Sequence, residues 1–103
     1  MALPVPVRYD RDGVPWWTHA PDATLGYGRD WADWLGGDHI ANAEWSADDG
    51  VLVLTSGLDG PRTWALLAVA PGTQGRDLTA TVHVTSGDGR RDSRSVRLKV
   101  RAR

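Results

Sequence analysis

Hydrophobic and polar residues alternate along the C-terminal third of the chain with the two-residue period of a β-strand. Over residues 78–85, one predicted face is apolar and the other is rich in threonine. The alternation returns over residues 95–101, where valine and leucine face one way and arginine and lysine face the other. A turn rich in Gly and Asp at 86–90 separates the two runs. The pattern therefore predicts an antiparallel hairpin with one buried face and one solvated face.

Shorter strand signals precede this hairpin. They are three apolar runs bounded by turn-rich segments and one brief extended segment, at 40–46, 51–55, 63–69 and 25–27. Helical periodicity is absent from every long window. Residues 30–35 are the exception, because Asp30 is a suitable N-cap and two glycines follow as a terminator. The sequence thus predicts an all-β antiparallel sandwich or barrel of about six to seven strands with one short helical turn.

The first 24 residues have a different character. They hold four of the six prolines, a turn sequence at 10–13 and the adjacent pair Trp16 and Trp17. We therefore predict an extended N-terminal arm over 1–24 and a sandwich domain over 25–103.

Composition narrows the functional classes. A chain of 103 residues without cysteine has room for one domain, and it lacks disulfides, thiolate nucleophiles and cysteine-ligated zinc. No apolar run approaches the roughly 20 residues of a membrane-spanning helix. The N-terminus contains two prolines and no basic residues before Arg8, so it does not match a secretory signal.

The overall charge of -1 conceals two opposite halves. Residues 90–103 contain seven basic residues and one acid, whereas residues 1–89 contain five basic residues and twelve acids. This asymmetry favours head-to-tail contact between subunits or a complementary partner, although basic residues can also simply protect a sheet edge. Nucleic-acid binding is disfavoured, because no aromatic residues interleave with the basic ones and the pI is near 6.2. The candidate partner-binding residues on this strand are Arg94, Arg97, Lys99 and Arg101.

Six tryptophans in a chain without phenylalanine have two interpretations. Exposed indoles can stack on sugar rings, or tryptophan can supply the core volume that phenylalanine usually provides. Trp45 and Trp64 fall within predicted strands and are assigned to the core. Trp31 and Trp34 share one side of the helical turn and can close the end of the sandwich. An adjacent pair on a proline-rich arm is suited to anchoring in a neighbouring subunit, so Trp16 and Trp17 are predicted partner contacts.

Catalytic and metal-binding patterns are weak. His19, His39 and His83 have no metal-ligand spacing, and Asp10-x-Asp12 lacks the further ligands of a calcium loop. Asp30 and Asp33 could form a carboxylate pair, but a small sandwich offers no cleft that would raise one pKa. A Gly-x-Ser-x-Gly motif is absent. We therefore predict a protein that is not an enzyme and uses no cofactor or metal.

Two segments resemble a known family. Residues 27–40, followed by Trp45, contain Tyr27, Asp30, Trp31 and Trp34 in the order Tyr-Gly-x-Asp-Trp-x-x-Trp-Leu. Residues 89–100 contain Gly-Arg-x-Asp-x-Arg-Ser with Asp92 at the acidic position. Both segments resemble the phage fiber-tail adaptor-like proteins, which are small proteins of tailed-phage virions.

The resemblance, which covers roughly residues 25–100, implies an immunoglobulin-like sandwich that acts as a non-enzymatic connector. It would bind other virion proteins of the tail, head-tail connector or fiber, with a homo-oligomer or ring as one arrangement and no nucleic-acid or membrane partner. The particle would be assembled in the host cytoplasm. Under this hypothesis residues 27–40 mainly close the core. A carbohydrate-binding or capsid-decorating module is the alternative.

Overall fold

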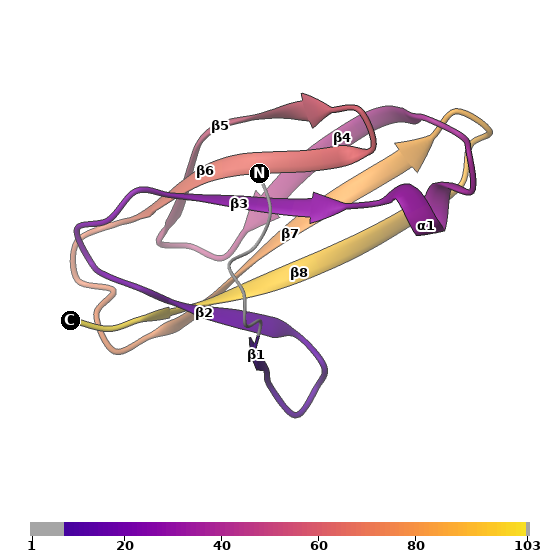
Figure 1. Cartoon of the computed structure of the whole chain (residues 1–103). Helices are drawn as coiled ribbons and strands as arrows, with labels where there is room; N and C mark the ends of the chain where they lie inside the picture. Colours follow the sequence, from indigo (N-terminus) through magenta and orange to yellow (C-terminus); the bar gives the residue numbers. More distant parts are fainter. Residues whose placement is uncertain (1–7, 103) are drawn as a thin grey trace.

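The computed structural model describes residues 8–102, and it is a β-sandwich made of two sheets (Figure 1). The all-β prediction is confirmed, whereas the immunoglobulin-like subclass stays a prediction. Within the described residues there are eight strands and one helix of a single turn. Their bounds are β1 (Arg8–Tyr9), β2 (Pro15–His19), β3 (Leu25–Asp30), α1 (Ala32–Leu35), β4 (Ile40–Ala47), β5 (Val51–Asp59), β6 (Arg62–Val69), β7 (Asp77–Ser86) and β8 (Arg91–Val100).

The five-stranded sheet has the order β1-β2-β8-β7-β4, and the three-stranded sheet has the order β3-β6-β5. The predicted hairpin is confirmed as β7 and β8, which pair Ala80 with Val96 and Leu78 with Leu98. Every position predicted to face inward on this hairpin is buried, because strand alternation directs these side chains towards the three-stranded sheet. One pair departs from the antiparallel prediction, since β2 runs parallel to β8.

The prediction of an arm over residues 1–24 is wrong for the part that the structure describes. β2 lies between β1 and β8, where Trp17 pairs with Leu98 and packs against the core. The prolines concealed this strand in the sequence, but Pro15 occupies its first position, where a missing N–H is tolerated. The sheet therefore begins before residue 25. Residues 1–7 and 103 lie outside the described residues.

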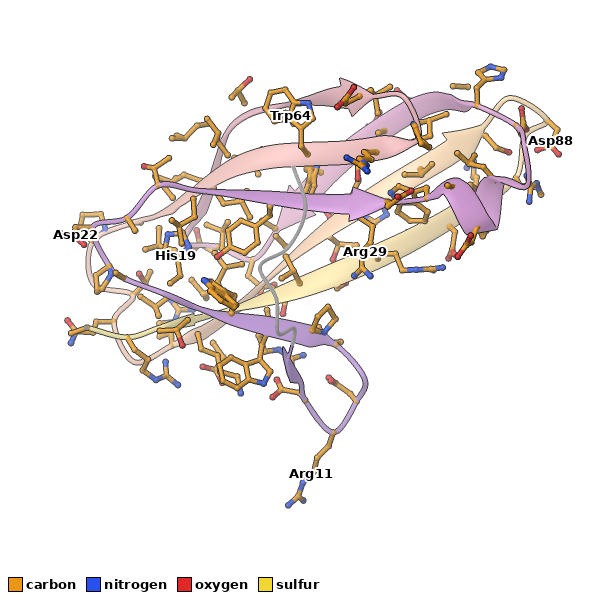
Figure 2. The ribbon with its side chains drawn as sticks, in the orientation of Figure 1. Arg11, His19, Asp22, Arg29, Trp64 and Asp88 are labelled. Carbon is orange, nitrogen blue, oxygen red and sulfur yellow. The ribbon has the colours of Figure 1, made fainter. Side chains whose placement is uncertain are left out.

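His19, at the end of β2, connects the two sheets (Figure 2). Its side chain is fully buried, and Nε2 donates to the Ala23 carbonyl oxygen at 2.8 Å. In the neutral ring, Nδ1 then accepts from the Tyr27 hydroxyl at 2.9 Å. Burial raises the pKa of Tyr27, which keeps that hydroxyl protonated as a donor. His19 therefore provides a buried polar link between β2 and β3.

The two core tryptophan assignments have different outcomes. Trp45 on β4 packs against both hydrophobic clusters of the core, although part of its surface is accessible. Trp64 on β6 faces away from the core, since its neighbours Thr63 and Ala65 take the two inward positions (Figure 2). The Trp64 indole lies over Gly57 of β5, where an added Cβ would stand 2.7 Å from Cζ2 of the ring. This close approach explains why a glycine that indicated a turn in the sequence lies within a strand.

Trp31 closes one end of the sandwich. Its side chain is only 2% exposed, and its indole N–H donates to the Thr63 hydroxyl at 3.0 Å. Its backbone N–H donates to the Pro61 carbonyl at 2.9 Å, so Trp31 is bonded both to the β5–β6 turn and to the start of β6.

We predict that Thr63→Val lowers the free energy of unfolding by about 1–3 kcal/mol, because the buried indole N–H of Trp31 loses its acceptor. Urea denaturation measures the change. Thr85→Val, on the partly exposed face of β7, is the matched control and should stay within about 0.5 kcal/mol of the original. The double variant Thr63→Val with Trp31→Phe should lose less free energy of unfolding than the sum of the losses of the two single variants. The reason is that each substitution removes the same hydrogen bond. Strict additivity would contradict this role.

Candidate protein-binding surfaces

The helical turn α1 is capped from both ends. Asp30 does not occupy the N-cap position, which belongs to Trp31, but its Oδ1 accepts the N–H of Ala32 at 2.9 Å. Asp30 therefore caps the helix through its side chain as predicted, but from the position one residue before the N-cap. At the other end Gly36 has a φ of 59°, a left-handed conformation that suits glycine.

Arg90 joins the two segments that carry the family resemblance. Its guanidinium donates to the carbonyl oxygens of Trp34 and Leu35, each at 3.0 Å, at the C-terminal end of α1, where carbonyl groups lack the partner that a longer helix would supply. The same guanidinium lies 4.9 Å from the centre of the Trp34 ring and contacts Asp88. The turn before β8 is thereby attached to α1, although about 55 residues separate them in the sequence.

Asp38 and Asp88 complete this end of the molecule. Asp38 Oδ2 accepts the N–H of Asp88 at 3.0 Å. The hydroxyl of Ser86 and then the guanidinium of Arg90 lower the pKa of Asp88 to about 2. Asp88 is thus ionised at neutral pH and holds the β7–β8 turn in shape.

Arg94 on β8 also contributes to this end. Its guanidinium forms an ion pair with Asp92 and lies 5.1 Å from the centre of the Trp31 ring. Trp31 and Trp34 meet edge to face with their centroids 5.5 Å apart, which confirms that they share one side of the turn. Asp92 and Arg94 therefore support the buried Trp31.

The basic side chains further along β8 are matched by the turn between β1 and β2. Asp10 forms ion pairs with Arg97 and Lys99, and Asp12 pairs with Arg97 at 2.9 Å. The pKa of Asp10 is lowered by Lys99 and then Arg97, and the pKa of Asp12 is lowered chiefly by Arg97. Lys99 also lies 4.2 Å from the centre of the Trp16 ring.

The basic residues near the C-terminus are thus largely paired with acidic residues of the same chain. Arg101 continues the pattern by pairing with Asp77 at 2.8 Å. All four basic residues predicted to bind a partner make ion pairs inside the molecule, and Trp16 and Trp17 lie in a paired strand. The contact of these six residues with a partner stays a prediction. Within the chain, the charged groups of the basic residues and the side chains of the two tryptophans already contribute to the fold.

An apolar pocket of about 440 Å³ opens beside α1. Its walls come from α1, from the loop that leads into β4 and from the β5–β6 turn. Ala32, Leu35 and Ile40 supply apolar surface, whereas Asp38 and His39 contribute polar groups. A pocket of this size and lining is suited to a hydrophobic side chain.

The free edge of β5 is a second apolar surface, and the sequence analysis missed it. Among the described strands β5 pairs with β6 alone, and the large apolar side chains Leu52, Val53, Leu54 and Leu58 are 37–56% exposed. The available signal was an eight-residue stretch without charge, from Val51 to Leu58, but alternation alone did not indicate whether it was central or at an edge.

His83 lies on the outer face of the five-stranded sheet, between two serines. Its Nε2 and Nδ1 are each 2.8 Å from a hydroxyl oxygen, of Ser46 on β4 and of Ser93 on β8. These are cross-strand polar contacts on an exposed face.

The described residues show neither a cluster of metal ligands nor a membrane-spanning helix. Within residues 8–102, no group of three or more His, Asp or Glu side chains could hold a metal ion. No helix in that part of the chain is long and apolar enough to cross a membrane. All six tryptophans are described, and each is buried or only partly exposed.

These features define a β-sandwich module with an apolar pocket at one end and an apolar strand edge. The model of the family described as "Podophage GP4 fiber-tail adaptor protein gp77" matches residues 19–99. The chain belongs to this phage fiber-tail adaptor family. A search of curated proteins finds no match.

The ion pairs of Asp10, Asp12 and Asp88 predict a loss of stability in acid. Their pKa values are lower in the folded chain than the ordinary value of 3.8, so their contribution is complete above about pH 4. It is lost as the pH falls through the folded values, which for Asp88 means towards pH 2. Asp10→Asn should melt at a lower temperature than the original chain at pH 7, and its melting temperature should fall less between pH 5 and pH 2.

Thermal melts followed by circular dichroism measure this difference. Asp49→Asn, in the exposed turn before β5, is the control and should follow the original chain at every pH. An Asp10→Asn variant that loses as much stability in acid as the original chain would show that the pairs with Arg97 and Lys99 contribute nothing.

Proposed function

We propose that this chain is a non-enzymatic connector of a tailed-phage or prophage-derived particle. It joins tail or head components to fibers through protein–protein contacts, is incorporated into the virion after assembly in the host cytoplasm, and binds neither nucleic acid nor membrane. The family membership over residues 19–99 supports the adaptor role. The observation that carries the proposal is the apolar pocket beside α1, because most of this concave surface is lined by residues between 32 and 40, within the segment that carries the family motif.

The pocket is suited to docking because its walls are fixed before a partner arrives. Trp31 bonds α1 to β6, Arg90 holds the carbonyls of Trp34 and Leu35, and Asp38 holds the β7–β8 turn. A rigid pocket loses little conformational entropy when it binds, so more of the contact energy appears as affinity. We infer that it receives an apolar side chain from a tail or fiber protein, with Asp38 and His39 fixing its orientation.

The basic strand has an indirect role in this proposal. Arg97 and Lys99 hold the turn that carries Asp10 and Asp12, and Arg94 supports Trp31 beneath the pocket. Replacing them would disturb partner binding through the fold. Trp16 and Trp17 contribute in the same manner, since β2 anchors the N-terminal hairpin to β8.

We predict that Ala32→Glu weakens binding to the partner while the domain remains folded. Ala32 is exposed at the rim of the pocket, and an acid at the first position of a helix is favourable, so the fold should tolerate it. A carboxylate there must be desolvated when an apolar side chain enters, so the affinity should fall by about tenfold or more. Biolayer interferometry with the purified tail and fiber proteins of the same phage measures the loss.

Thr24→Glu is the matched control, because Thr24 is exposed in the β2–β3 loop, outside the pocket. Its binding should equal that of the original chain. Two results would contradict the proposal: no binding to either protein, or undiminished binding by Ala32→Glu. Saturable binding on a glycan array that disappears in Trp34→Ala would instead support the carbohydrate-binding alternative.

A further inference from the structure

The β5 edge combines two features that are seldom left together on a protein surface. Its outer side has no strand partner within the described residues, and its backbone groups are therefore available for pairing. Four large apolar side chains on the same strand are exposed, with Leu54 the most exposed at 56%. Natural proteins usually protect such an edge with lysine, proline or a covering segment, and β5 carries none of these residues. The edge is therefore suited to accept an added strand.

The charges that flank β5 restrict what the added strand can be. Asp48 and Asp49 precede the apolar stretch, and Asp59 follows it. In an antiparallel pair of two β5 strands centred on Thr55, Asp59 of one copy would lie opposite Val51 and close to Asp49 of the other. These two negative charges would repel each other, so a second β5 strand is a poor partner. The favoured strand is apolar and carries no acid.

Residues 2–7 of this chain have that composition. The segment Ala-Leu-Pro-Val-Pro-Val contains no charge, and Arg8 follows it in the sequence. Pro4 and Pro6 lack an N–H, whereas Leu3, Val5 and Val7 retain theirs. In an extended chain alternate N–H groups point to the same side, so over residues 3–7 the segment has one edge with all its donors and one edge with none. Such a strand can pair on one side only and must be the outermost strand of a sheet, which is the position open beside β5.

Residues 2–7 lie too close to β1 in the sequence to run along the β5 edge of their own chain. β1 lies four strand positions from β4 in the five-stranded sheet, which is about 19 Å at the usual spacing. β5 packs beside β4 but belongs to the other sheet, which lies roughly 10 Å away at right angles to that direction, so the straight path from β1 to β5 is about 21 Å. The seven residues before β1 span at most about 24 Å. They would be consumed in the crossing and could not also run along β5.

We propose that residues 2–7 of one copy add as a strand to the β5 edge of a neighbouring copy. The two surfaces in this contact differ, so successive copies assemble head to tail and close into a ring or extend into a filament. A ring would deepen the adaptor role proposed above, because repeated copies strengthen weak individual contacts to tail and fiber. The contact itself is measured without any phage partner, so the two proposals can fail separately.

The test uses two full-length variants, each altered on one side of the contact. Val5→Asp disables the donor segment and keeps β5 intact, whereas Leu54→Lys disables the edge and keeps residues 2–7 intact. Light scattering after gel filtration should show oligomers for the original chain and monomers for each variant. An equimolar mixture of the variants should recover a one-to-one dimer, because each supplies the surface that the other has lost. Ala41→Lys, exposed on the edge strand β4, is the control and should assemble like the original chain.

The outcomes separate the possible occupants of the edge. A monomeric original chain would overturn the proposal, as would a Val5→Asp variant that assembles normally. If only Leu54→Lys lost assembly, the edge would bind a second β5 or another segment. Equal melting temperatures by circular dichroism establish that both variants are folded, since Leu54 is exposed. Val5→Pro is a second donor variant that removes one N–H of the pairing edge without adding charge, and it too should be monomeric.

Cysteine cross-linking gives an independent readout, because the natural chain contains no cysteine. Chains carrying Val5→Cys, mixed with chains carrying Leu54→Cys, should form a disulfide-linked dimer under mild oxidation. The same donor mixed with Ala41→Cys should not. Equal cross-linking in the two mixtures would overturn the proposed pairing. If assembly fails in these experiments while tail and fiber binding persists, the connector function stands alone.

Discussion

The position of β8 is the constraint on which the rest of the structure depends. This strand lies in the interior of the five-stranded sheet, between β2 and β7, and its alternate residues Val96, Leu98 and Val100 fill the core. Its other face carries several arginine and lysine side chains, which would repel one another without acidic partners. Acidic side chains from outside the strand neutralise this charge: Asp10 and Asp12 of the β1–β2 turn pair with basic residues of β8, and Asp77 of β7 pairs with Arg101 just after it. The N-terminal hairpin is therefore part of the domain, because it supplies both a parallel strand and the counter-charge for β8.

The same strand explains how the pocket end is formed. The turn that leads into β8 carries Arg90, whose five N–H donors can bind two carbonyls of α1 and a carboxylate together. A helix of one turn has little stability of its own, since nucleation fixes several residues for few hydrogen bonds. It persists because Trp31 is buried beneath it and Arg90 covers its C-terminal carbonyls. The pocket is consequently a product of contacts between distant segments, and its geometry follows from the packing of β8.

Local patterns were sufficient for most of the fold and insufficient for its surfaces. The alternation in β7 and β8 and the glycine after Leu35 report directly on local backbone geometry, so those elements were predictable. The strand β2 was not predictable. Prolines beside an adjacent tryptophan pair are typical of an extended arm, and the sequence does not show that the segment pairs in parallel with β8. Trp64 was assigned to the core since its strand was recognised, but the face depends on register, and a shift of one residue reverses it. The internal pairing of Lys99 with Asp10 joins residues 89 positions apart, which no local pattern reveals.

The exposed edges of the two sheets differ in how well they are protected from pairing with another strand. β4 carries Glu44 and has an irregular register near Ile40, and β3 ends in Arg29 and Asp30, so both edges have features that oppose pairing. β5 has an irregularity between Val53 and Thr55, but its charge begins only at Asp59. Its exposed leucines contribute little to the isolated domain, because each keeps close to half of its surface in water. Their burial would stabilise only an assembled state. The apolar character of β5 therefore belongs to the energetics of association, whereas the ion pairs of β8 belong to those of folding.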